Sequence, residues 1–188
     1  LRPVNSLDAL MRFYPLYAAQ FESHAEPFES YAQWGAGLLK DLNDIDRQGA
    51  DPALVWRATA EWEALEQWGR SEEVTGAGRR RRLALLQALP LLHTQWHEAL
   101  RADGTGTTGL IMRTASPADR GPDPDAWNRL RSEWGIDRWV FAGFNALTPC
   151  EEALFLWVLE RGEAVFRFDA DAHYLNEDYH EAGLYLRR

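Results

Sequence analysis

Residues 138–143 read Arg138-Trp139-Val140-Phe141-Ala142-Gly143, an apolar run with the length and composition of a buried β-strand. The stretch Thr148-Pro149-Cys150-Glu151 follows a few residues later. Thr148 is a typical helix N-cap, Pro149 suits the first helical position, and Glu151 can complete a capping box. These residues therefore predict a strand that runs through a short loop into a helix.

The next segment completes a supersecondary unit. The helix is expected to run to Arg161, and residues 163–168 (Glu163-Ala164-Val165-Phe166-Arg167-Phe168) predict a second strand. A strand, a helix and a strand at this spacing form a βαβ unit with parallel strands. Because parallel sheets normally have more strands and are covered on both faces, further strands are expected from outside this sequence. Replacement of Val140 by Pro is expected to remove a hydrogen-bond donor from this sheet.

The part before this unit is predicted to be helical. Helices are expected over 7–22, 27–46, 53–68 and 79–102, and a short helix capped by Asp125 is expected to end near Trp134. Residues 110–115 fit either a helical turn or a short strand. The predicted domains are therefore a helical bundle at 1–134 and the βαβ portion at 135–188.

Apolar periodicity identifies the faces of these helices that should be buried. The second helix has Phe28, Tyr31, Gly35, Leu38, Leu42 and Ile45 on one face. The long helix has Leu85, Leu86, Leu89, Leu92, Trp96 and Leu100. The expected apolar members of the third helix are Leu54, Trp62, Leu65 and Trp68.

Composition restricts the function classes. The formal net charge of −9 should weaken nucleic-acid binding, so any contact needs a local basic patch. The single cysteine, Cys150, excludes an intrachain disulfide and fits a reducing cytoplasm; we interpret it as structural. No apolar run approaches the roughly 18 residues of a membrane span, so no membrane partner is expected.

One basic run is a candidate DNA contact. Arg79, Arg80, Arg81 and Arg82 are consecutive at the start of the long helix. Clustered arginines bind phosphate, although a solvated surface is the alternative interpretation. Any binding through this run is expected to be weak and salt-sensitive.

Three further groups resemble metal sites but are interpreted more simply. His93 and His97 have zinc-ligand spacing, but Thr94 replaces the Glu of a zincin motif, so they are interpreted as ordinary helix-face residues. Asp41, Asp44 and Asp46 do not share one helical face and are expected to be a solvated helix end. The acidic cluster of Asp169, Asp171, His173, Glu177 and Asp178 lacks the EF-hand Gly and closing Glu and is expected to be a solvated loop. No metal and no cofactor is predicted.

Three stretches, in order, carry a family resemblance. Residues 139–152 resemble the second-motif region of AddB-type subunits of bacterial helicase–nucleases, and of relatives described as PD-(D/E)XK nuclease family proteins. Residues 34–47 resemble a segment before it in the same proteins, and residues 169–175, with 179–183 after them, resemble a segment that follows it. The resemblance implies an internal piece of a longer protein: the helical insertion of a helicase-like domain, followed by one βαβ unit of an incomplete P-loop-helicase-like sheet.

The departures from this family pattern predict that the chain has no catalysis of its own. A working helicase ends the returning strand with Asp-Glu, which holds Mg²⁺ and orients water, whereas Ala142 and Gly143 stand here. No Gly-x-x-x-x-Gly-Lys-Ser/Thr loop is present in the sequence. The chain is therefore not expected to be an enzyme. Its expected fold class, from the elements above, is mostly α with a small α/β part.

The expected role is a structural and DNA-handling segment of a DNA repair and recombination protein. Its expected partners are the rest of the parent polypeptide, a helicase–nuclease partner subunit and, weakly, DNA. The alternative is a self-contained helical protein-interaction domain, which the aromatic composition also allows. A more distant third possibility is a metal-dependent hydrolase built on the acids of 169–181.

Overall fold

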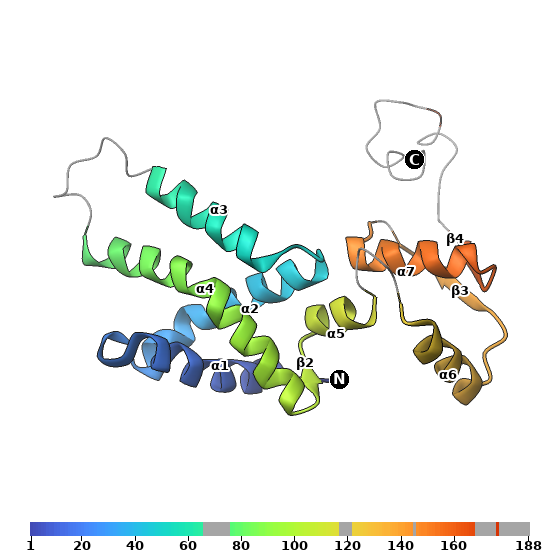
Figure 1. Ribbon diagram of the computed structural model, residues 1–188, viewed down its shortest axis with the longest axis horizontal. Helices are drawn as coiled ribbons and strands as arrows, with labels where there is room; N and C mark the ends of the chain where they lie inside the picture. Colours follow the sequence, from blue (N-terminus) through green and yellow to red (C-terminus); the bar gives the residue numbers. More distant parts are fainter. Residues whose placement is uncertain (66–75, 117–121, 145, 168–175, 177–188) are drawn as a thin grey trace. The chain divides into compact units, whose positions relative to one another are not determined.

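The computed structural model describes residues 1–65, 76–116, 122–144, 146–167 and 176. It is mostly helical and contains one parallel βαβ unit, which confirms the expected fold class (Figure 1). Contacts divide the chain into two units, Leu1–Thr114 and Ala115–Arg188. Each unit is described by itself below.

The first unit begins with two helices joined by a short turn. Helix α1 spans Ser6–Phe21 and passes through Pro15 without ending. Its N-cap is Asn5, whose side chain accepts a hydrogen bond from the backbone N–H of Asp8. The 3₁₀ turn η1 covers Glu22–His24, and helix α2 covers Phe28–Arg47 after the N-cap Pro27.

Two further long helices pack together after α2. Helix α3 spans Pro52–Leu65 and helix α4 spans Ala77–Ala102, with Pro90 inside it. The predicted faces of α2 and α4 are confirmed, because their central residues are buried. The buried core of the unit comprises Ala9, Phe13, Tyr17, Tyr31, Leu38, Leu39, Leu42, Trp56, Leu86, Leu89, Leu92, Trp96, Leu100 and Leu110.

The prediction of which apolar residues of α3 are buried is wrong. Leu54, Trp62 and Leu65 are 56%, 67% and 65% exposed, while Trp68 lies outside the described residues. The buried face instead contains Trp56 and Glu63, which are i and i+7 and therefore share one side of the helix. Glu63 tolerates this position because its carboxylate lies 3.5 Å from Arg82 of α4.

A small parallel strand pair was not predicted. Strand β1 (Arg2–Pro3) pairs with β2 (Thr105–Gly106), which follows α4. Helix α5 then spans Thr108–Ala115. Residues 110–115, for which the sequence allowed either a helical turn or a short strand, are therefore helical. Gly109 is needed in its first turn, because a Cβ there would lie 2.2 Å from the backbone oxygen of Asn43.

The second unit begins with helix α6, which spans Pro124–Trp134. Its N-cap is Asp123 and not the expected Asp125, because Pro124 occupies the first helical position. Trp127 of α6 lies against Trp139 and Trp157 and donates a hydrogen bond to Glu163 at 2.7 Å. These contacts join α6 to the βαβ residues. The boundary between the two units therefore lies after Thr114, whereas the domain boundary predicted from the sequence lies after residue 134.

The βαβ unit has the predicted arrangement. Strand β3 (Trp139–Ala142) and strand β4 (Ala164–Arg167) are parallel, with Trp139 opposite Ala164 and Phe141 opposite Phe166. Helix α7 (Pro149–Glu160) connects them. Its capping box is confirmed: Thr148 Oγ1 accepts from the N–H of Glu151, and the Glu151 carboxylate accepts from the N–H of Thr148.

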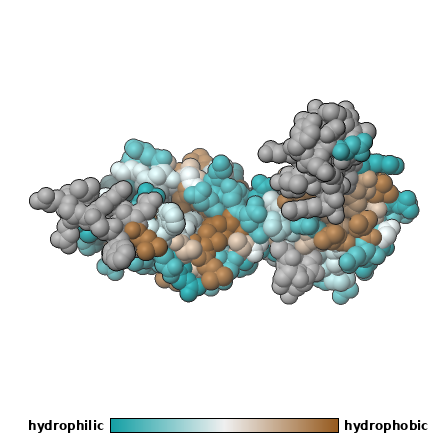
Figure 2. All heavy atoms as spheres, turned by 90° about the horizontal axis from the view of Figure 1, so that it is seen from above, coloured by the Kyte–Doolittle hydropathy of each residue, from teal (hydrophilic) through white to brown (hydrophobic). Residues whose placement is uncertain are grey.

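The two faces of β3 differ in the described structure. Phe141 lies 4.6 Å from Phe155 of α7 between ring centroids and stacks on Phe166 of β4. Val140, on the opposite face, is 65% exposed. The expectation that this strand is covered on both faces is therefore not met by the residues described. In the view of Figure 2, hydrophobic residues are exposed at the surface among hydrophilic ones.

Candidate nucleic-acid interface

The arginine run lies in the first turns of α4. Arg80, Arg81 and Arg82 are exposed there, while the Arg79 side chain lies outside the described residues. Positive charge is unfavourable at a helix N-terminus. Two carboxylates reduce this cost: Glu26 contacts Arg81 at 3.1 Å, and Glu63 contacts Arg82 at 3.5 Å.

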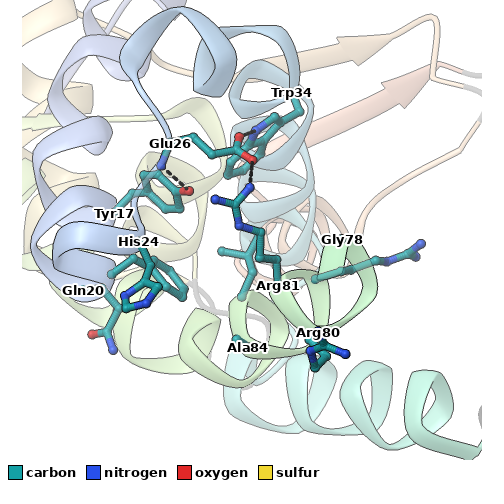
Figure 3. A pocket seen from close by; sticks show the side chains of 12 residues that line it. Tyr17, Gln20, His24, Glu26, Trp34, Gly78, Arg80, Arg81 and Ala84 are labelled. Atoms are coloured by element: carbon teal, nitrogen blue, oxygen red, sulfur yellow. Dashed lines mark hydrogen bonds and ion pairs between the residues drawn. The ribbon is translucent and has the colours of Figure 1, made fainter. Parts of the chain in front are cut away.

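The run borders a cavity of about 700 Å³ between α1, η1, α2 and the start of α4 (Figure 3). We call this cavity the arginine pocket. Its walls combine aromatic side chains, polar groups and three arginines. The lining residues are Tyr17, Gln20, Phe21, His24, Glu26, Trp34, Gly78, Arg80, Arg81, Arg82, Ala84 and Leu85.

The aromatic wall of the arginine pocket packs against the buried ring of Tyr31. Tyr17 stacks on the buried Tyr31, with ring centroids 5.4 Å apart, and meets Trp34 edge to face. Tyr31 fits because residue 35 is glycine: a Cβ there would lie 2.6 Å from the Tyr31 ring. Trp34 and Phe21 are only half-buried, so part of each ring remains accessible to a ligand.

Glu26 connects this wall to the arginines. Its carboxylate accepts hydrogen bonds from Trp34 Nε1 at 3.0 Å and from Arg81 at 3.1 Å. Its backbone N–H donates to the hydroxyl of Tyr17 at 3.3 Å. Figure 3 shows Arg81 reaching from α4 toward Glu26, whereas Arg80 lies farther away beside Ala84. The cavity thus offers aromatic surface and guanidinium groups together, a combination suited to planar, anionic ligands.

A second group of polar residues is buried deep in the first unit, and the sequence interpretation of it was wrong. Asp46 is 1% exposed, so it is not part of a solvated helix end. His93 and His97 are also buried, and both face Asp46. Oδ2 of Asp46 lies 2.8 Å from His97 Nε2 and 3.4 Å from His93 Nε2, and Arg113 Nη1 lies 3.7 Å from Oδ1. We call these four residues the Asp46 cluster.

The Asp46 cluster links four helices. Asp46 belongs to α2, the histidines to α4 and Arg113 to α5, while Trp56 of α3 donates from Nε1 to His93 Nδ1 at 3.4 Å. Arg113 also donates to the carbonyl oxygen of Ala50. Burial alone would raise the pKa of Asp46, but hydrogen bonds from His93 and His97 outweigh burial and lower it. Burial lowers the pKa of His93, and this effect outweighs the hydrogen bond to Asp46, which acts in the opposite direction.

The ligand atoms of Asp46, His93 and His97 lie within 4.8 Å of one another, close enough to consider a metal ion. Two contacts oppose that interpretation. Trp56 can only donate, so Nδ1 of His93 must accept and its ring proton must lie on Nε2, where a metal would bind. The Arg113 guanidinium already supplies positive charge beside the carboxylate. The geometry fits a buried hydrogen-bonded network with a paired charge.

Further residues singled out from the sequence belong to the second unit. Cys150 is fully buried in the first turn of α7, and its carbonyl oxygen accepts from Ser116 Oγ at 2.9 Å. Strand β3 ends at Ala142, one residue before the end that the sequence predicted, and Gly143 follows with φ +80°. Residues 169, 171, 173, 177 and 178 of the acidic cluster lie outside the described residues.

Comparison with known proteins gives no assignment: no family model, no curated protein and no solved structure matches this chain. Among the helices that the structure describes, none combines the length and apolar character needed to cross a membrane.

Proposed function

We propose that this chain is a non-catalytic structural and DNA-handling segment of a larger helicase–nuclease subunit of DNA repair and recombination, working in the cytoplasm. The parallel β3–α7–β4 unit is the observation that carries the proposal. In the AddB-type proteins that the sequence resembles, a strand returns to a parallel core at this place. A parallel pairing of β3 with β4 is what that resemblance requires.

The described residues leave one face of β3 exposed at Val140, and this also supports membership in a larger sheet. Two-stranded parallel sheets are rare alone, because both faces and both edges of such a sheet are normally covered. Val140 projects an exposed apolar side chain from one face, and β4 pairs with one edge of β3. We infer that strands and helices of the parent protein cover these surfaces.

The DNA-handling part of the proposal is supported by the arginine pocket. Its three arginines form a local basic surface on a chain with net charge −9. Phosphate contacts can dominate affinity even where the net charge is unfavourable, provided that the cations are clustered.

The coding sequence around this segment tests the parent-protein proposal. An open reading frame that continues on both sides, with a nuclease segment downstream, is the expected result. A short frame that encodes little beyond these residues would contradict it. It would favour a self-contained helical interaction domain, to which the exposed Trp62 and Leu65 of α3 could contribute a contact surface.

A further inference from the structure

We propose that the arginine pocket binds one unpaired base of single-stranded DNA together with a neighbouring phosphate. This inference rests on the proposed DNA-handling role and names its substrate class and its site. The volume is suitable: about 700 Å³ lies within the range of small-molecule pockets and exceeds what one nucleotide needs.

The half-buried rings of Trp34 and Phe21 supply the stacking surface. Base–aromatic stacking contributes about 1–3 kcal/mol per base and tolerates any base. Tyr17 is 6% exposed, so it supports Trp34 from behind and offers little surface of its own. Because Tyr17 and Tyr31 fix the position of Trp34, the wall loses little conformational entropy when a base docks.

Arg81 and Arg80 supply the phosphate contacts. The ion pair of Arg81 with Glu26 is exposed on the arginine side, with 61% of that side chain accessible. Such pairs contribute only about 0–1 kcal/mol, so a phosphate can replace the carboxylate at small cost. Glu26 then acts as a competitor that occupies Arg81 while no strand is bound. It also keeps its second hydrogen bond to Trp34.

The pocket geometry favours single strands over duplex. A base can enter a cavity between helices only after it has left its stack and its partner, which costs a few kcal/mol in duplex DNA. A free nucleotide has the same base and phosphate chemistry but lacks the further phosphates of a DNA strand, so it cannot occupy Arg81 and Arg80 together. We therefore propose single-stranded DNA as the ligand. Duplex DNA and a free nucleotide are the two alternative ligands, and the experiment below includes both.

The experiment measures binding of the full chain to labelled oligothymidylate of about 12 nucleotides by fluorescence anisotropy, at about 50 mM salt and above. The same measurement is made with a duplex, and thymidine monophosphate is added as a competitor. The variants are Arg81→Gln, Trp34→Leu and Glu26→Gln. The matched control is Arg101→Gln, which removes the same charge from an exposed position at the other end of α4.

Trp34→Leu is expected to weaken binding about fivefold or more through lost stacking. Arg81→Gln is expected to weaken it and to reduce the salt slope by about 0.7. Glu26→Gln is expected to tighten binding about two- to fivefold, because the competing charge is removed while a side-chain oxygen remains for Trp34. Arg101→Gln should leave binding close to that of the unchanged chain. A tightening by Glu26→Gln cannot result from misfolding.

Other outcomes would contradict the site, the preference for single strands, or DNA binding as a whole. If the chain binds the strand but Arg81→Gln, Trp34→Leu and Glu26→Gln all behave like Arg101→Gln, this pocket is not the site, although DNA handling stands. If the duplex binds as tightly, or the monophosphate competes as well as the strand, the inference of a single-strand site is wrong. If the chain shows no binding at low salt, DNA handling itself fails together with this inference.

Discussion

Asp46 and His97 are separated by 51 residues in the sequence, yet Oδ2 of Asp46 lies 2.8 Å from Nε2 of His97 in the buried centre of the first unit. This hydrogen bond joins the end of α2 to the C-terminal part of α4. His93 and Arg113 face the same carboxylate, so one buried side chain organises contacts from three helices. The stability of the first unit should depend on it.

Replacing Asp46 with Ala is expected to destabilise the chain by about 3 kcal/mol or more, because it leaves two buried histidines without their shared acceptor and Arg113 without its ion-pair partner. Urea unfolding followed by circular dichroism measures this change. Asp41→Ala is the control, since Asp41 is exposed on the same helix. Equal effects of the two substitutions would show that the Asp46 cluster contributes no special stability.

Stability should also fall as the pH decreases below about 6.5. Burial lowers the pKa of folded His93 below its ordinary value of 6.5, so the unfolded chain binds a proton first. Stability from this group is therefore complete above 6.5 and is lost as the pH falls toward the folded pKa, with a slope of at most about 1.4 kcal/mol per pH unit. Asp46, whose pKa is also lowered, acts in the same direction below 3.8.

Urea titrations between pH 8 and pH 5 measure this slope. His93→Gln should flatten it because the titrating group is gone, while His24→Gln should not, since His24 is exposed. A slope that His93→Gln leaves unchanged would assign the pH dependence to other groups.

The sequence predicted the Asp46 cluster less well than it predicted the βαβ unit, and the physical reason is clear. Strand, capping box and strand are local signals, because each depends on residues close together in the chain. The burial of Asp46 depends on α4 and α5, which are distant in sequence. One local signal was present: Asp46 is four residues after Leu42 and therefore lies on the buried face of α2. Of the arginine pocket, only the run Arg79–Arg82 was identified from the sequence. Its aromatic wall was not, because that wall comes from α1 and α2, which are distant from the run in sequence.

The capping box of α7 gives a local test of the second unit. Thr148→Ala removes the side chain that accepts from the N–H of Glu151, and it should cost about 1 kcal/mol. Thr148→Ser keeps the acceptor and should cost less. Thermal unfolding of both variants checks the order; a larger loss for Ser than for Ala would contradict the capping role.

The last prediction concerns the edge of β3 that pairs with no strand among the described residues, and it corrects an expectation from the sequence. Backbone N–H groups of alternate residues in a strand point to the same side, and the N–H of Trp139 donates to the carbonyl of Glu163, which directly precedes β4. The N–H of Phe141 therefore faces β4, whereas that of Val140 faces the opposite edge. Val140→Pro removes no donor from the β3–β4 pair, contrary to what the strand pattern alone suggested.

Two proline substitutions therefore distinguish an edge strand from a central one. In this chain, Phe141→Pro should disrupt the βαβ unit, and Val140→Pro should be tolerated better, because proline is accepted where the N–H faces solvent. In the proposed parent protein both should be harmful, since a further strand would pair with Val140. Limited proteolysis and hydrogen exchange of β4 measure the effect. If Val140→Pro is as well tolerated in the parent protein as in this chain, no strand pairs at that edge, and the proposed larger sheet does not extend beyond β3.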